Sequence, residues 1–133
     1  MKKILSLILA LVLTVSCLGG AVFAAEAEVS YTVDGVTKDG SMADAVTAVK
    51  AAGSGTIKLL KDYAFSGTDD IYAIDGMPSF TLDLNGFAFT SNVRGIRVTK
   101  TGNDTVTHII DSVGTGSLNT AGVAVGCQRA VCT

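Results

Sequence analysis

Three side chains of complementary chemistry recur at one spacing in the second half of the chain. Lys58, Asp83 and His108 follow one another at a step of 25 residues, each within a short run of alternating polar and apolar residues. A cation, a carboxylate and an imidazole on neighbouring strands can bind an anionic sugar or exchange protons with a substrate. Opposite charges on neighbouring strands are also ordinary on a solvated sheet face. We interpret the three as a charge-compensated ladder, with a binding site as the alternative.

An aromatic residue and a cation form a second candidate pair. Tyr72 and Arg97 lie one step of 25 residues apart, and both are expected to point to solvent from neighbouring strands. Such a pair can stack on a sugar ring or form a cation–π contact. Isolated aromatic residues on a surface are nevertheless ordinary and require no ligand. Tyr72 and Arg97 are therefore candidates for binding, with plain exposure as the alternative.

Clustered acids and thiols suggest two further kinds of site. Asp69, Asp70 and Asp75 gather in one predicted loop and offer the oxygen ligands that calcium prefers, but their spacing matches no calcium-binding loop. Aspartate is a common turn residue, so we expect no metal and no cofactor. Cys127 and Cys132 can pair in an oxidising compartment, and two unpaired thiols are an equal alternative. The sequence contains no phosphate-binding loop, zinc spacing or nucleophile elbow, and no residue is predicted to be catalytic.

The first 24 residues have the pattern of an export signal. Lys2 and Lys3 precede an apolar run from Ile4 to Val15, and small residues surround Ala24. This order is typical of a secretory signal peptide, with cleavage after residue 24. An uncleaved membrane anchor is the alternative. We expect the protein to act outside the cytoplasm and to meet the membrane only during export.

Beyond the export signal, the composition indicates one small, mildly acidic domain. It carries eight Lys and Arg against twelve Asp and Glu, a net charge of −4. An acidic surface without a basic run argues against nucleic acid or anionic lipid as a partner. The partner expected instead is an extracellular polysaccharide or a host or cell surface.

Two local elements are predicted ahead of the repeats. Residues 25–40 are expected to form a short β-hairpin, because alternating residues lead into Asp34–Gly35, a dipeptide that suits a tight turn. Residues 41–53 are predicted to form an amphipathic helix that begins at a capping serine and ends at a glycine. The helix is expected to cover the open end of the first repeat. Its covering side chains would be Met42, Val46 and Val49.

Residues 54–133 repeat at the step of 25. Thr56–Leu60 falls on Thr81–Asn85 and then on Val106–Ile110, and a second strand at Ile71–Ala73 returns in the same way. A period of this length with about three short strands is typical of a parallel β-helix, or solenoid, whose coils stack about 4.8 Å apart. We therefore expect a mainly β fold with about three coils. Alternation points these residues inward: Ile57, Leu59, Ile71, Ala73, Leu82, Leu84, Ile96, Val98, Thr107, Ile109, Ala121 and Val123.

Several motifs resemble the start of the pectin-lyase-like right-handed parallel β-helix proteins that bacteria secrete, above all their surface and adhesin-like members. The resemblance covers about residues 41–120 and implies a right-handed β-helix at a bacterial cell surface. Enzymes of this family cleave acidic polysaccharides, and their lyases use calcium held by aspartates, but no motif here matches those sites. The motifs that carry it are the Ser-led helix, Gly55–Asp62, Leu82–Gly86, and Ile109–Ser112 with Gly114 and Gly116.

Two functions are consistent with these patterns. The first is a secreted or surface-displayed β-helix module for binding carbohydrate or a surface, as in adhesion. The alternative is the N-terminal fragment of a polysaccharide lyase or glycoside hydrolase, since no second cap follows the third repeat and the chain is expected to be truncated. The sequence leaves enzyme activity open and favours none for the chain as it stands.

Overall fold

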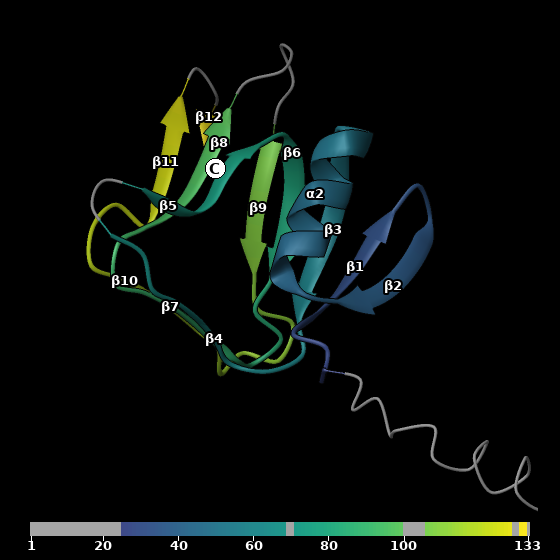
Figure 1. Ribbon diagram of the computed structural model, residues 1–133, viewed down its shortest axis with the longest axis horizontal. Coiled ribbons are helices and arrows are strands. Elements are labelled where there is room, and N and C mark those ends of the chain that lie inside the picture. Colours follow the sequence, from purple (N-terminus) through teal and green to yellow (C-terminus); the bar gives the residue numbers. More distant parts are fainter. Residues whose placement is uncertain (1–24, 69–70, 100–105, 129–130, 133) are drawn as a thin grey trace, which may run out of the picture.

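A computed structural model describes residues 25–68, 71–99, 106–128 and 131–132. These residues form one helix and three small sheets around a shared core (Figure 1). The elements in chain order are β1 (Val29–Val33), β2 (Val36–Gly40), α2 (Met42–Ala52), β3 (Ser54–Leu59), β4 (Tyr63–Phe65), β5 (Tyr72–Met77), β6 (Ser79–Asp83), β7 (Ala88–Ser91), β8 (Arg94–Thr99), β9 (Val106–Ile110), β10 (Ser117–Thr120), β11 (Val125–Gln128) and β12 (Val131–Cys132).

The hairpin and the helix form where the sequence predicts them. Strands β1 and β2 pair antiparallel around Asp34 and Gly35, which both have positive φ. The hydroxyl of Ser41 accepts a hydrogen bond from the Asp44 amide at 3.1 Å and so caps α2. The helix ends at Gly53 in the left-handed conformation. No helix among the described residues is both long and apolar enough to cross a bilayer.

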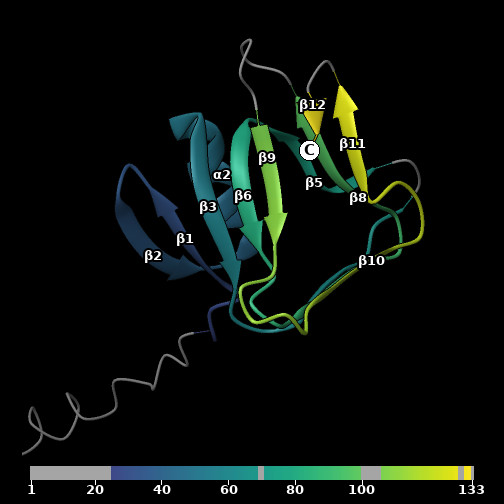
Figure 2. The ribbon, with the colours of Figure 1, turned by 180° about the vertical axis from the view of Figure 1, so that it is seen from behind.

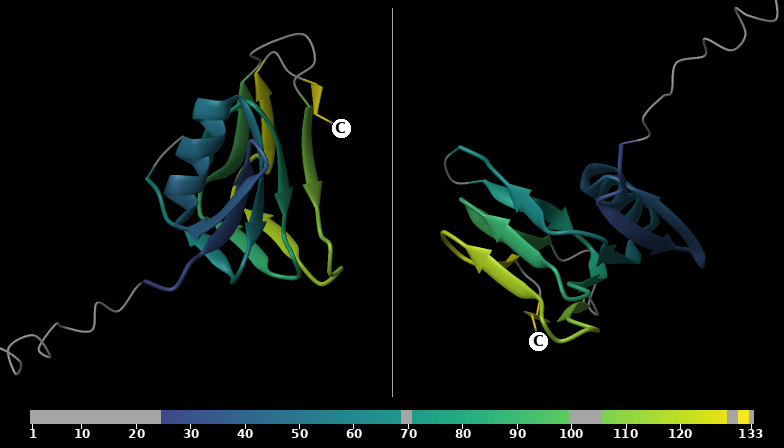
Figure 3. Two further views of the ribbon diagram at one scale, coloured as in Figure 1. Left: turned by 90° about the vertical axis from the view of Figure 1, so that its right-hand side faces the viewer. Right: turned by 90° about the horizontal axis from the view of Figure 1, so that it is seen from below.

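The largest sheet is mixed, and the two smaller ones are parallel. Its order is β12-β9-β6-β3-β1-β2, and the smaller sheets are β10-β7-β4 and β11-β8-β5 (Figure 2). The mixture arises because β1 runs antiparallel to β3, whereas β3, β6 and β9 run parallel to one another. Figure 3 shows α2 and the β1–β2 hairpin at one end of the molecule, with β10 and β11 in yellow at the other.

The expected right-handed parallel β-helix of about three coils is wrong. The strands lie in separate small sheets, mixed and parallel, and not in a uniform solenoid. The predicted step of 25 holds where Ile57 pairs with Leu82, but Leu82 pairs with Ile109 and Ile74 pairs with Ile96. Turns of unequal length change the step from one pair of strands to the next, because loops tolerate insertions. The antiparallel hairpin adds strands that belong to no repeat.

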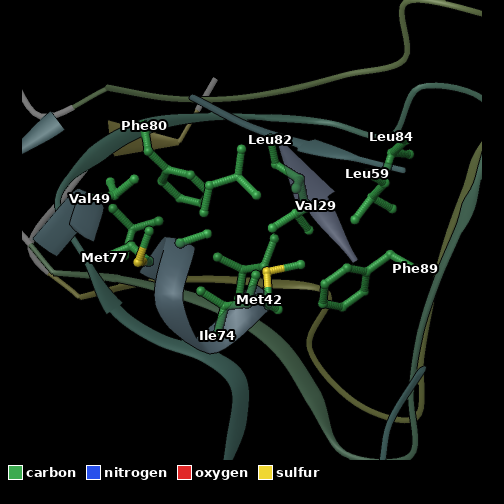
Figure 4. Packing of buried hydrophobic residues seen from close by; sticks show 14 residues of the cluster. Val29, Met42, Val49, Leu59, Ile74, Met77, Phe80, Leu82, Leu84 and Phe89 are labelled. Carbon is green, nitrogen blue, oxygen red and sulfur yellow. The ribbon is translucent and has the colours of Figure 1, made fainter. Parts of the chain in front are cut away.

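The core lies between α2 and the sheets (Figure 4). Helix α2 buries Met42, Ala45 and Val49 and packs against β1, β3 and β5, since its apolar stripe recurs at helical spacing. Phe89 from β7 is fully buried and closes the other side. The remaining buried apolar residues are Val29, Ile57, Leu59, Ile74, Met77, Phe80, Leu82, Leu84, Ile96 and Val98.

The second predicted strand is displaced by about one side chain of register. Ile71 is 44% exposed and Val123 is 50% exposed, so their predicted inward positions are wrong. Ile74 and Met77 occupy the core instead. Thr107 is buried as predicted, and its hydroxyl has no hydrogen-bond partner among the described residues.

Candidate functional site

Four charged and aromatic side chains, here named the tyrosine–arginine cluster, meet on the sheet β11-β8-β5. Tyr72 and Asp75 come from β5, and Arg94 and Arg97 come from β8; all four are partly exposed. The guanidinium carbons of Arg94 and Arg97 lie 5.5 and 5.2 Å from the centre of the tyrosine ring. Both distances are within cation–π range. The structure therefore brings the candidates Tyr72 and Arg97 together and adds a second arginine.

A β-bulge in β5 places Asp75 beside Arg97. The strand register shifts between Ile74 and Met77, which leaves Asp75 and Gly76 opposite the single residue Arg97. Gly76 has a φ of 64°, a conformation that glycine adopts without the steric cost of a Cβ atom. Bulges commonly re-aim a side chain, and this one turns the carboxylate toward the guanidinium.

Asp75 and Arg97 form a two-pronged ion pair. The Nε atom of Arg97 donates to Asp75 Oδ1, and its Nη2 atom donates to Oδ2 at 2.7 Å. The two side chains remain 46% and 38% exposed respectively, so the pair contributes little to the stability of the fold. Hydrogen bonding to Asp75 raises the pKa of Arg97 above its ordinary value. The pair therefore holds a permanent cation in one orientation at the surface.

A cleft of about 500 Å³ opens beside the cluster. Its walls are the turn before β8 and the loop between β10 and β11, and Arg94 belongs to both the cleft and the cluster. The volume is within the range of small-molecule sites. Small residues leave the space open, two valines supply apolar walls, and an amide and a guanidinium supply polar groups. The lining residues are Gly67, Asn92, Val93, Arg94, Ala121, Gly122 and Val123.

Hydrogen bonds hold both walls of the cleft in place. Asn92 Oδ1 accepts from the Gly67 amide at 2.9 Å, and Asn92 Nδ2 donates to the Gly67 carbonyl at 3.1 Å. On the other side, the Gly95 amide donates to the Val123 carbonyl at 2.9 Å. The cleft is consequently preformed, which reduces the entropy lost when a ligand binds.

The predicted ladder of charges is only partly assembled. Lys58 pairs with Asp83 across β3 and β6, and Lys58 Nζ lies 3.7 Å from Asp83 Oδ2. His108 pairs with Thr81, and Ile110 lies beside Asp83 instead. The expected place of His108 in the column is therefore wrong, because β9 is shifted by two residues relative to the step of 25. Lys58, Asp83 and His108 do not form one site.

Two aspartates, here named the corner carboxylates, lie where the chain turns after β6 and after β9. Asp83 Oδ1 accepts from the amides of Asn85 at 2.9 Å and Ser112 at 3.0 Å. Burial by itself raises the pKa of Asp83, but the hydrogen bonds from Ser112 and Asn85, together with Lys58, outweigh it and leave the pKa lowered. Asp83 is thus a charged acceptor that serves the backbone.

The second corner carboxylate, Asp111, is bound in the same manner. Its Oδ1 atom accepts from the amide of Gly86 at 2.7 Å, and its Oδ2 atom accepts from the amide of Gly116 at 2.5 Å. Burial opposes ionisation, but the surrounding amides more than compensate and lower the pKa of Asp111. Because backbone amides occupy both oxygens, this carboxylate fastens turns and is poorly placed to act on a ligand.

The remaining candidates lie partly outside the described residues. Asp69 and Asp70 are among these, and Asp75 binds Arg97. No group of three possible metal ligands gathers within the described part of the chain. Cys127 and Cys132 lie in β11 and β12, but their side chains are outside the description. Their pairing stays a prediction.

Sequence reasoning missed Arg94 and the cleft. Strict alternation places residues three apart on opposite faces of a strand, yet Arg94 and Arg97 both reach the solvent side while Gly95 and Ile96 between them are buried. The available signal was an arginine next to the turn residue Asn92, three positions from a second arginine. That signal has meaning only once the turn is known to face the loop before β11.

Comparison with family models, with curated proteins and with solved structures finds no match to this chain. The resemblance to pectin-lyase-like proteins accordingly rests on the sequence motifs alone. Any function has to be argued from the tyrosine–arginine cluster, the cleft and the export pattern.

Proposed function

We propose that the protein is a carbohydrate-binding module that acts outside the cell, secreted or displayed on its surface, and that the tyrosine–arginine cluster is its binding site. One observation carries the proposal: Tyr72 lies between the guanidinium groups of Arg94 and Arg97 at the rim of a cleft of about 500 Å³. The export pattern of residues 1–24 supports the location.

The chemistry of the cluster suits sugar hydroxyls. A hydroxyl both donates and accepts hydrogen bonds, whereas the carboxylate of Asp75 only accepts and the guanidinium of Arg97 only donates. Held side by side, the two groups can bind adjacent hydroxyls of one sugar ring. Tyr72 adds an aromatic body with a polar tip, a combination that favours partly wet interfaces. Because the ion pair already orders these side chains, binding costs less side-chain entropy.

A glycan array probed with the purified protein tests the proposal. We expect a limited set of glycans to bind, and titration calorimetry then measures the dissociation constant of the best one. An array without any bound glycan would show that the proposed function is wrong.

Variants of the cluster locate the site. Arg97→Gln removes the cation and half of the two-pronged pair, and we expect it to weaken glycan binding about tenfold or more. Lys38→Gln is the matched control, since it also removes one positive charge but lies on exposed β2. Equal effects of the two variants would indicate a charge effect and not a site.

Export is tested separately from binding. The protein is expressed in a bacterial host with residues 1–24 present, and cell fractions are blotted for it. We expect the outside fraction to contain a chain that N-terminal sequencing finds to begin after residue 24. Retention of the full chain in the cytoplasm would contradict the extracellular location while leaving the binding result unaffected.

A further inference from the structure

We propose that the cleft beside the cluster receives the terminal residue of a glycan that is both acidic and N-acylated, with its carboxylate at Arg94 and its acyl methyl group between Val93 and Val123. This inference rests on the proposed function and names the sugar class. It follows from three properties of the cleft: its charge, its apolar walls and its rigidity.

The charge of the cleft comes from Arg94. A guanidinium has five N–H donors in one plane and matches a carboxylate with two parallel hydrogen bonds. It can keep its contact with the ring of Tyr72, at 5.5 Å, and other partners while it offers two donors to a ligand. Arg97 lies beside it with its charge compensated by Asp75. The cleft therefore presents a cation that can recognise an acid, next to a neutral ion pair that suits hydroxyls.

The apolar walls of the cleft ask for a small hydrophobic substituent. Val123 is 50% exposed and Val93 is partly exposed, and both line the cleft. A methyl group that contacts both removes apolar surface from water, which is favourable in proportion to the buried area. A uronic acid has a carboxylate without such a group, whereas an N-acylated neutral sugar has the methyl group without the acid. A sugar that carries both fits the two walls together.

The rigidity of the cleft favours a compact terminal residue. Asn92 is fixed to Gly67 by two hydrogen bonds, and the loop after β10 is tied to β8 through Gly95 and Val123. The hydroxyl of Thr120 also bonds the Gly122 carbonyl at 3.0 Å. A volume of about 500 Å³ accommodates one sugar residue with its substituents and leaves no room for a polymer to pass through.

Calorimetric titration of the full chain with three monosaccharides tests the sugar class. N-acetylneuraminic acid carries both groups, glucuronic acid carries only the carboxylate, and N-acetylglucosamine carries only the acyl group. We expect N-acetylneuraminic acid to bind at least about tenfold more tightly than either comparator. Equal binding of glucuronic acid, or of N-acetylglucosamine, would overturn the inference.

Variants of the cleft supply the second arm. Gly122→Ala places a methyl group about 3.3 Å from Arg94 Cγ and narrows the cleft, and Val123→Ser removes half of the apolar wall from an exposed position that the fold does not need. We expect each to weaken binding of N-acetylneuraminic acid about tenfold. The matched control is Val113→Ser, which alters a 62% exposed valine outside the cleft.

The outcomes separate the two proposals. If glycans bind on the array and depend on Arg97 but not on Val123 or Gly122, the sugar class is wrong and the proposed function holds. If no glycan binds, both fail. Circular dichroism of each variant checks that a loss of binding does not reflect a loss of fold.

Discussion

Asp111 accepts hydrogen bonds from the amides of Gly86 and Gly116 on neighbouring turns, whereas Asp75 meets a guanidinium and stays 46% exposed. The corner carboxylates are saturated by the backbone and hold the chain together. The tyrosine–arginine cluster is held by its own side chains and remains open to solvent.

The comparison teaches that the partner of a charged group separates a structural role from a binding role. Asp83 has a lowered pKa and lies beside a lysine, features that are often associated with functional sites. Its acceptors are nevertheless occupied by amides of the turns, so the perturbation reflects architecture. In the cluster, Tyr72, Arg94 and Arg97 keep polar atoms available next to a cleft.

The largest effect is expected from a charge placed beneath the corner. Leu84→Asp puts an unpaired carboxylate in an almost fully buried position next to Gly116, and we expect a loss of about 4 kcal/mol or more in the free energy of unfolding. Chemical denaturation measures it. The control Val113→Asp lies on a 62% exposed side chain and should change stability by less than about 0.5 kcal/mol. Similar losses in both would contradict the buried position of Leu84.

A smaller effect is expected from removing a corner carboxylate. Asp111→Ala leaves the amides of Gly86 and Gly116 without their acceptor, and an unpaired donor next to the core is costly. We expect the unfolding temperature to fall by several degrees in a thermal scan. Asp111→Asn retains one carbonyl acceptor and should recover part of the loss. An unchanged unfolding temperature in the alanine variant would show that these turns hold without the carboxylate.

Acid should loosen the corner before it affects the rest of the fold. The pKa values of Asp83 and Asp111 are lowered in the folded chain, so the folded state binds fewer protons than the unfolded state. Their stabilisation is present above about pH 4 and is lost as the pH falls through the folded pKa values. We expect the unfolding temperature to be level from about pH 7 to pH 5 and to fall below pH 4.

An Asn variant at both corner positions controls the acid experiment. It should start from a lower unfolding temperature at pH 7 and decline less steeply below pH 4, since the two titrating groups are gone. An equally steep decline would assign the acid sensitivity to other carboxylates.

The smallest effect on stability is expected in the cluster. Tyr72→Ala removes an exposed ring contact, and we expect the unfolding temperature to change by no more than about 2 °C while glycan binding is lost. Thermal scanning and calorimetric titration of the same sample measure both quantities. A large drop in unfolding temperature would assign the cluster to the architecture, as for the corner carboxylates, and would remove the contrast between the two regions.

Local features of the fold were predictable because their causes are local. The turn at Asp34–Gly35 and the capped helix Met42–Ala52 depend on residues within a few positions of one another. The pairing of Lys58 with Asp83 was also predicted, since β3 and β6 keep the step of 25. The solenoid and the place of His108 were not, because both assume one step for every strand.

The candidate site was predictable only in part. Tyr72 and Arg97 were identified as a pair, but the bulge that brings Asp75 to Arg97 depends on the register shift in β5. A sequence overlay assigns inward and outward positions by counting, and one extra residue in a strand reverses the count. Arg94 was missed for a related reason, as β8 buries the two residues after it.

The sequence by itself determined the hairpin, the helix with its caps, and the apolar alternation that makes the rest of the chain form strands. These follow from backbone preferences and from the period of hydrophobic residues. The tertiary structure alone decided the three separate sheets, the shifted register of β9 and the union of Arg94 with Tyr72 beside a cleft. Strand register is set by distant side chains packing around one core and by the lengths of intervening turns, and neither is encoded in any single stretch of the chain.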